Sequence, residues 1–174
     1  MKKRLTQRAQ AMLQAALRHF PELAGRTIKV GYTRAHLGSA LIPRQVEAEL
    51  TIRLKVRQLS YNTIGHELTH LVQGLSHLEA SFERIPSGEK PCDIWTLARS
   101  ELFCDDAPTY LKLPKTIREQ WPSYAKAVHE LCRAAIEKRA TQRMYIAWLE
   151  AEIQQLARRN LQTNAGGAQL QLHF

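Results

Sequence analysis

The sequence predicts an α+β domain in which a small mixed sheet is followed mainly by helices. Two segments in the first third of the chain alternate apolar and polar residues with the two-residue period of a strand. Longer segments repeat apolar residues every three to four positions, as helices with one buried face do. The chain has 174 residues, 44% of them hydrophobic, and is long enough to bury a core of ordinary size.

The first part of the chain is expected to supply one helix and the strands of the sheet. In chain order we predict a helix at residues 4–20, a strand at 27–32, a loop or short edge strand at 34–43 and a strand at 48–56. Pro21 ends the helix. Pro43 cannot donate to a ladder, which confines the segment before it to an edge of the sheet. Residues 48–56 form the clearest strand because five apolar residues alternate with polar ones.

The rest of the chain is expected to be largely helical. We predict helices at residues 61–77 and 93–106, and a helical composition from Pro122 to Asn160. One helix over the last segment would be about 58 Å long, so we expect a break near residues 138–141 and an antiparallel pair. The chain then divides into a core at residues 1–113, a helical extension packed on the core at 114–160 and a tail at 161–174.

The net charge of +9 is distributed unevenly along the sequence. Residues 1–60 contain twelve Lys or Arg against three Asp or Glu, residues 61–110 three against eight, and residues 111–174 ten against five. A basic surface permits nucleic-acid binding. Because no long basic cluster, no interleaving of basic and aromatic residues and no nucleic-acid motif accompanies it, we interpret the charge as serving solubility. Nucleic acid is a permitted partner but not the favoured one.

The sequence also disfavours membrane and secreted locations. No run of eighteen apolar residues is present, so neither a transmembrane helix nor a membrane partner is expected. The basic start at residues 1–4 is followed by neither an apolar segment nor a cleavage site, so we expect a cytoplasmic protein. The three cysteines, Cys92, Cys104 and Cys132, are odd in number and lack C-x-x-C spacing. They are expected to be reduced structural thiols.

Residues 66–70 read His-Glu-Leu-Thr-His, which is the pattern H-E-x-x-H. On a helix, His66 and His70 lie on one face and can reach a single metal ion. Glu67 can then face a water at that metal and take its proton, as in zinc peptidases. Apolar residues recur at the helical period on the opposite face, namely Ile64, Leu68, Leu71, Val72 and Leu75. A catalytic Zn²⁺ site also needs a third protein ligand.

Three residues are candidates for that third ligand. Glu101 is favoured because it shares a helix face with Asp105, so that one carboxylate could bind the metal while the other accepts the N–H of a ligating His. Asp93 lies on about the same face but is expected to cap the start of its helix. His77 follows His70 by seven residues, which is one residue out of register with the metzincin pattern.

An H-E-x-x-H helix followed by a helix with E-x-x-x-D resembles the gluzincin metallopeptidases, and the small sheet and short chain resemble their minimal members, the minigluzincins. The resemblance covers about residues 27–113 and implies a zincin-like core. The residues that it assigns are His66, His70 and Glu101 as zinc ligands, Glu67 as general base and Asp105 as partner of a ligating His. The run Leu37–Ala40, together with H-E-L-T-H, is more weakly similar to SprT-type proteases, which act on DNA-bound proteins.

The expected function is hydrolysis of peptide bonds in a peptide or protein substrate by a zinc metallopeptidase. The strand at residues 48–56, or one beside it, could hold an extended substrate along a free edge. Residues 170–174 alternate like a peptide substrate and could occupy the cleft, which would keep the enzyme latent. The alternatives are a SprT-like protease acting on DNA-associated proteins and a non-catalytic basic interaction protein on a zincin fold. The intact Glu67 argues against the latter.

Overall fold

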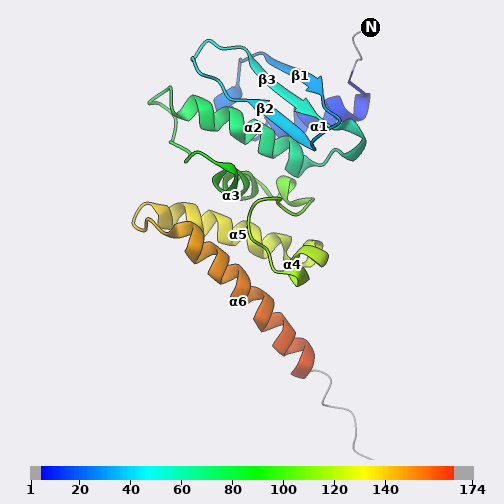
Figure 1. Cartoon of the computed structure of the whole chain (residues 1–174), viewed down its shortest axis with the longest axis vertical. Coiled ribbons are helices and arrows are strands. Elements are labelled where there is room, and N and C mark those ends of the chain that lie inside the picture. The colour runs from blue at the N-terminus through cyan, green and yellow to red at the C-terminus, as the bar shows by residue number, and fades with distance from the viewer. Residues whose placement is uncertain (1–4, 167–174) are drawn as a thin grey trace, which may run out of the picture.

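The structure, a computed structural model, describes residues 5–166 and has an α+β fold as predicted (Figure 1). Its described part contains six α-helices and a three-stranded mixed sheet. The elements are α1 (Gln7–Leu17), η1 (Pro21–Leu23), β1 (Ile28–Tyr32), β2 (Gly38–Leu41), β3 (Leu50–Leu54), η2 (Val56–Gln58), α2 (Tyr61–Ser76), α3 (Glu89–Arg99), η3 (Glu101–Cys104), α4 (Lys115–Glu119), α5 (Trp121–Arg139) and α6 (Tyr145–Gly166). None of the helices in this part of the chain has the length and apolarity that crossing a membrane requires.

The three strands lie in the order β1-β3-β2, with β3 at the centre (Figure 1). β1 pairs with β3 in parallel, and β2 pairs with β3 in antiparallel orientation. Leu50, Ile52 and Leu54 of β3 are almost fully buried, whereas the residues between them are half-buried or exposed. The strand predicted at residues 48–56 is therefore confirmed, and residues 34–43 contain the short edge strand β2. Within the described residues, no further strand pairs with the second edge of β2.

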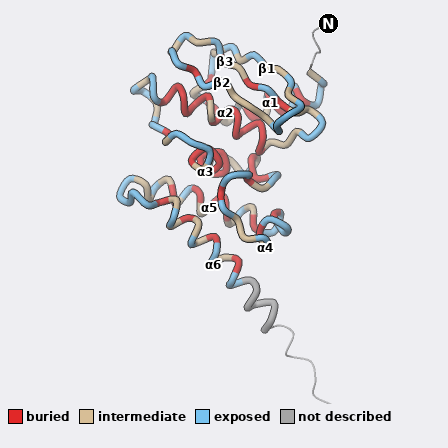
Figure 2. Tube along the Cα trace, viewed as in Figure 1, coloured by how far each residue is buried: buried red, intermediate tan, exposed pale blue. Residues whose placement is uncertain are grey.

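Helix α2 lies between the sheet and helix α3 and is buried along most of its length (Figures 1 and 2). The helix predicted at residues 61–77 is confirmed to within one residue. Two glycines allow neighbouring elements to approach α2 closely. A Cβ on Gly65 would lie 2.6 Å from the ring of Phe103, and a Cβ on Gly74 would lie 2.6 Å from Pro43. The helix is thus held on one side by η3 and on the other by the segment that follows β2.

Helix α3 begins at Glu89, four residues before the predicted start at residue 93. Gly88 precedes it with a φ of 108°, in a backbone conformation that favours glycine. Pro91 stands in the first turn, where its missing N–H costs no intrahelical hydrogen bond. The helix ends before Ser100, and the short helix η3 follows, so the predicted single helix at residues 93–106 is divided in two.

Helices α5 and α6 form a hairpin that packs below α3 (Figure 1). The turn between them confirms the break predicted near residues 138–141. One hydrophobic cluster includes Leu50 of β3, Leu97 of α3 and Ile153 of α6. The C-terminal helices therefore share a core with the rest of the molecule.

The last helix extends further than predicted. A tail was expected from residue 161, but helix α6 continues to Gly166. Residues 170–174, which the sequence suggests as a cleft-blocking segment, lie outside the described residues.

Candidate metal centre

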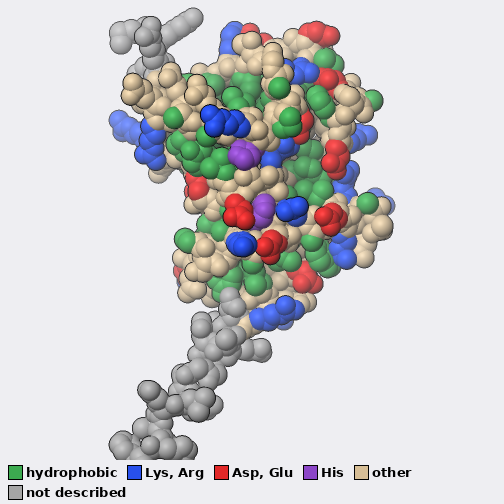
Figure 3. Space-filling model, turned by 180° about the vertical axis from the view of Figure 1, so that it is seen from behind, with side chains coloured by type: hydrophobic (Ala, Val, Ile, Leu, Met, Phe, Trp, Pro, Cys, Tyr) green, Lys and Arg blue, Asp and Glu red, His purple; other side chains and the backbone are tan. Residues whose placement is uncertain are grey.

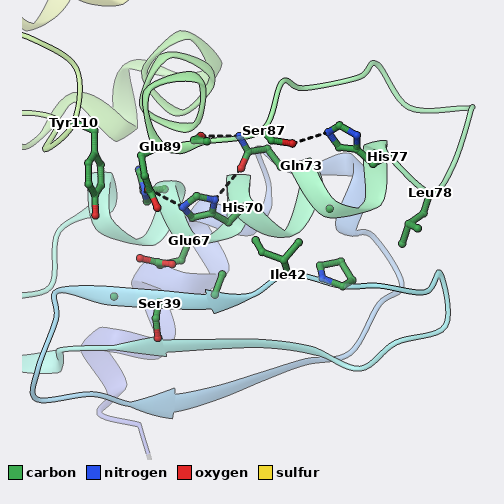
Figure 4. Close-up of a pocket in the computed structure, with 16 residues that line it drawn as sticks. Ser39, Ile42, Glu67, His70, Gln73, His77, Leu78, Ser87, Glu89 and Tyr110 are labelled. Atoms are coloured by element: carbon green, nitrogen blue, oxygen red, sulfur yellow. Dashed lines mark hydrogen bonds and ion pairs between the residues drawn. The ribbon is translucent and has the colours of Figure 1, made fainter.

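His66 and His70 lie one turn apart on α2, and the centroids of their rings are 4.7 Å apart. The Nε2 atom of each ring lies 3.0 Å from the same carboxylate oxygen, Oε2 of Glu89. Two imidazoles and one carboxylate therefore converge on a single point where α2 faces the start of α3; Figure 4 shows His70 and Glu89 of this group. The helical spacing in H-E-x-x-H accounts for the two imidazoles, and the start of α3 accounts for the carboxylate.

Glu89 stands in the position for which the sequence analysis favoured Glu101. Glu101 is exposed at the start of η3 and makes no contact with either histidine, so the prediction that it lies beside them is wrong. The break at Ser100 separates Glu101 from the face of α3 that meets α2. The spacing E-x-x-x-D is nevertheless present at this face, as Glu89 and Asp93.

Asp93 orients the ring of His66 and does not lie with Glu89 at the two Nε2 atoms. Its buried carboxylate has Oδ1 at 2.8 Å from Nδ1 of His66. Its other oxygen, Oδ2, accepts hydrogen bonds from the backbone N–H groups of Tyr110 and Leu111. Burial lowers the pKa of His66, but the hydrogen bond and charge of Asp93 outweigh that effect and raise the net pKa. A proton held on Nδ1 leaves Nε2 as the nitrogen that can bind a metal.

Gln73 orients the ring of His70 through its Nδ1 atom, as Asp93 orients the ring of His66. Its Oε1 lies 2.8 Å from Nδ1 of His70, three residues earlier on the same helix. Its Nε2 donates to the carbonyl oxygens of Pro86 and Gly88, at 2.7 and 3.0 Å. Gln73 therefore ties the orientation of His70 to the loop that leads into Glu89 (Figure 4). This role was not predicted from the sequence, although Gln73 follows His70 by three residues, a spacing that puts both side chains on one helix face.

Asp105 was predicted to hold a ligating His, but it caps helix α2 instead. Its two carboxylate oxygens accept hydrogen bonds from the backbone N–H groups of Tyr61 and Asn62, at 2.7 and 2.8 Å. Ser60 accepts the next free N–H, that of Thr63. A carboxylate at this end of a helix also interacts favourably with the helix dipole. Asp105 thus fixes the start of the helix that carries the histidines.

The Asp105→Ala variant is expected to lower the free energy of unfolding by about 1–2 kcal/mol, because two N–H groups at the start of α2 lose their acceptor. Urea unfolding followed by circular dichroism measures this change. The neighbouring Asp106→Ala is the matched control, since Asp106 accepts only from the adjacent Ala107 N–H. Equal destabilisation by both variants, or loss of metal binding by a folded Asp105→Ala protein, would contradict the capping role.

His77, the remaining candidate ligand, binds the loop after α2. Its Nε2 lies 3.1 Å from the carbonyl oxygen of Ile85, and its Nδ1 accepts a hydrogen bond from Nε of Arg84. It lines the same hollow as His70 but shares no hydrogen bond with the two histidines of the motif. Figure 4 shows it at the far end of α2, bonded to Ser87.

Glu67 lies on the sheet side of the two histidines, with its side chain against Gly38 of β2. A Cβ at position 38 would lie 2.4 Å from Oε1 of Glu67, so only glycine leaves room for the carboxylate there. Glu67 is 5% exposed. Burial, which has the largest effect, and the charge of Glu89 raise the pKa of Glu67, and the charge of His66 lowers it. The net pKa is about 7. The carboxyl group is therefore able to accept and release a proton near neutral pH.

Cys92 is a second residue close enough to complete a metal site. His66, His70 and Cys92 each offer a ligand atom within 4.8 Å of the others, so this cluster could hold a metal ion. The Cys92 thiol, however, is fully buried and donates to the backbone carbonyl oxygen of His66 at 3.2 Å. Burial, together with neighbouring carboxylates, raises the pKa of this thiol well above its ordinary value. In the metal-free protein Cys92 is therefore a buried neutral thiol, whereas Glu89 presents an oxygen to both rings.

The residues of the motif lie midway along a cleft between β2 and α2. On one side a hollow of about 530 Å³ extends past His70 toward Ile42 and Leu78. On the other side a hollow of about 350 Å³ extends toward His36. Both hollows share Gly38, His66, Glu67 and Tyr110 in their lining. An extended chain lying along the free edge of β2 would therefore pass Glu67 and the histidines (Figure 4).

Comparison with family models, curated proteins and solved structures finds no match for this chain. The chemistry of the site is therefore argued from its own residues. They comprise two oriented imidazoles, a carboxylate shared between them and a second, buried carboxyl group on the cleft side.

Proposed function

We propose that the protein is a zinc-dependent peptidase with a zincin-like core, in which His66, His70 and Glu89 hold the metal and Glu67 is the general base. The observation that carries the proposal is the convergence of both Nε2 atoms on one Glu89 oxygen, at 3.0 Å each, beside a buried carboxyl group in an open cleft. A H-E-x-x-H helix that faces a helix with E-x-x-x-D also supports the resemblance to gluzincins.

The donor atoms fit zinc better than the other common cations. Two imidazole nitrogens and one carboxylate oxygen form a set that catalytic zinc sites use, whereas magnesium and calcium prefer oxygen ligands alone. Asp93 and Gln73 hold the outer nitrogens of the two rings, which is the support that ligating histidines normally receive. Zinc bound by these three residues would polarise a peptide carbonyl and make a water molecule more acidic near neutral pH.

Glu67 supplies the proton transfers of the proposed reaction. Its carboxylate takes the proton of the attacking water and then delivers it to the leaving amine. A carboxyl group suits both steps, because it can be deprotonated before the attack and protonated after it. Gly38 keeps the space that this side chain needs beside β2.

Tyr110 would stabilise the negative charge that develops on the carbonyl oxygen. Its ring stacks on His66 with centroids 5.6 Å apart, and it lines both hollows of the cleft. Burial, together with the charges of nearby carboxylates, raises the pKa of Tyr110, so its hydroxyl stays protonated and can donate a hydrogen bond. Asp93 fixes this residue through its backbone N–H.

The substrate of this proposal is an extended polypeptide. The free edge of β2 offers backbone groups for main-chain pairing, and an added strand would lie over Glu67. Ile42 and Leu78, which are 45% and 39% exposed, line the hollow beyond His70 and would contact an apolar side chain of the substrate.

Removal of the metal tests the proposal. Treatment of the full chain with 1,10-phenanthroline is expected to slow cleavage of fluorescent casein at least about 100-fold, because the metal contributes several kcal/mol to the barrier. Zn²⁺ added back should restore the rate, and Mg²⁺ should not. A serine-protease inhibitor is the control that should change nothing. Undiminished cleavage by protein shown to lack bound metal, or no cleavage of casein by the zinc-loaded protein, would overturn the proposal.

A further inference from the structure

A third hollow, of about 560 Å³, lies at the ends of β1 and β3 and is strongly basic. We call it the basic pocket, and its lining residues are Tyr32, Thr33, Arg34, Lys55, Val56 and Arg57. Three of the six carry a positive charge and none carries a negative one. Arg34 and Arg57 are exposed, and Lys55 is half-buried. The residues come from the segment after β1 and the segment after β3, which the parallel pairing of the two strands brings together.

The three cations of the basic pocket have no partner of opposite charge in the described part of the chain. Some other cations are paired, among them Arg26 with Glu79 and Arg99 with Glu22. On the face turned away in Figure 1, basic and acidic side chains lie side by side (Figure 3). Three like charges around one hollow repel each other, and an anion bound among them would relieve that repulsion.

The basic pocket lies close to one end of the cleft. The backbone N–H of Lys55 donates to the carbonyl oxygen of Leu37 at 2.9 Å, so the two segments are neighbours in the sheet. Leu37 and His36 line the hollow beside Glu67, and Arg34 lines the basic pocket. Lining residues of the two hollows are therefore adjacent, in the sheet at Lys55 and Leu37 and along the chain at Arg34 and Ala35, so a few extended residues of a substrate can reach from one hollow to the other.

We propose that the basic pocket binds acidic side chains of a polypeptide substrate, a few residues away from the bond that is cleaved. Its role in turnover rests on the proposed peptidase function, but its binding of acidic chains does not. A polypeptide is favoured over nucleic acid because three cations line this one hollow, fewer than the roughly six to ten phosphate contacts of a strongly salt-dependent DNA-binding protein. The free edge of β2 and the apolar hollow past His70 also suit a polypeptide.

Direct binding tests the proposal without requiring catalysis. The probes are a fluorescent ten-residue peptide rich in Glu, its counterpart with Gln in place of Glu, and a ten-nucleotide single-stranded DNA, each titrated with the full chain. The double variant Arg34→Ser with Arg57→Ser is compared with Lys126→Ser with Arg143→Ser. The control pair removes the same charge from exposed positions on and after α5.

The Glu-rich peptide is expected to bind the wild type at least about tenfold more tightly than the Gln peptide, and more weakly as salt increases. The Arg34/Arg57 double variant should lose that advantage, and the control pair should change affinity less than about twofold. If both double variants lose the same affinity for the Glu-rich peptide, net charge explains the binding and the proposal is overturned. Tighter binding of the DNA than of the Glu peptide, lost in the Arg34/Arg57 variant, would assign the pocket to nucleic acid instead.

Turnover of matched substrates separates the two proposals. Peptides that share one cleavable core carry three Asp or three Ser on one side, and kcat/KM is measured for each. The wild type should prefer the Asp peptide by about tenfold, and the Arg34/Arg57 variant should cleave both equally. Cleavage with no preference and no selective binding overturns the acidic subsite and leaves the peptidase proposal intact. Selective binding without cleavage of any peptide overturns the peptidase proposal and leaves the subsite.

Discussion

The Glu67→Gln variant is expected to cleave peptides about 10²- to 10⁴-fold more slowly than the wild type while binding the same amount of zinc. Gln has the shape of Glu, so it fills the space beside Gly38, but it cannot take a proton from water. The loss should fall on kcat, because the substitution removes a proton transfer and leaves the cleft unchanged. Steady-state kinetics with a fluorogenic peptide, together with zinc per chain from atomic spectroscopy, measure both quantities.

Two measurements separate lost chemistry from lost folding in that variant. Glu130→Gln, an exposed change on α5, is the control that should leave kcat unaltered. Burial raises the pKa of Glu67 from 4.5 to about 7, so the folded state holds this proton more tightly than the unfolded state does. The metal-free wild type should therefore lose stability as pH rises from 4.5 to about 7, whereas Glu67→Gln should not share this loss. A Gln variant that retains wild-type kcat would remove Glu67 from the reaction.

The elements of this fold could be predicted where one side of a segment is buried and the other is not. The alternation in residues 48–56 identifies β3, and the helical period in residues 61–77 identifies α2, because burial imposes these periods directly on the sequence. The start of α3 was misplaced for a local reason. Gly88 and Pro91 are typical of loops, but Gly88 here leads into the helix and Pro91 fits its first turn.

The misplaced helix start accounts for the misplaced acidic residue. With α3 expected to begin at residue 93, Glu89 falls before the predicted helix, and the E-x-x-x-D spacing within that helix is Glu101 with Asp105. The same spacing four residues before Asp93 was present in the sequence. The choice between the two identical spacings depends on where α3 begins and ends and on which of its faces meets α2, and the packing of segments distant in sequence decides this. Helix periodicity in the sequence does not specify this packing.

The local motif and its supporting groups differ in how far they could be read from the sequence. H-E-x-x-H brings two imidazoles together through helix geometry, so the four-residue spacing alone is sufficient to predict that they lie side by side. Asp93 and Asp105 both follow the motif and both are acidic, yet one holds His66 and the other caps α2. Their roles depend on where the chain turns after α2, which no residue pattern within either segment specifies.

The Glu89→Ala variant is expected to lose zinc affinity by more than about 100-fold, since even residues that only support metal ligands typically contribute 10- to 100-fold. His66 and His70 should remain in place, because Asp93 and Gln73 hold their outer nitrogens independently of Glu89. Competition with a chromophoric zinc chelator measures the affinity. Glu101→Ala is the matched control, and it should bind zinc as the wild type does because Glu101 is exposed on η3.

The Cys92→Ser variant decides between the two sets of residues that could hold the metal. If the third ligand were the Cys92 sulfur, serine would bind zinc far more weakly, because zinc sites use thiolate and not hydroxyl ligands. If the third ligand is Glu89, serine should change zinc affinity only slightly, since its hydroxyl can donate to the His66 carbonyl as the thiol does. The thiol is buried and donates to the His66 carbonyl, while Glu89 already lies 3.0 Å from both Nε2 atoms, and this geometry favours the second result. Zinc retained by Glu89→Ala and lost by Cys92→Ser would reverse the assignment and leave Glu67 beside a thiolate site.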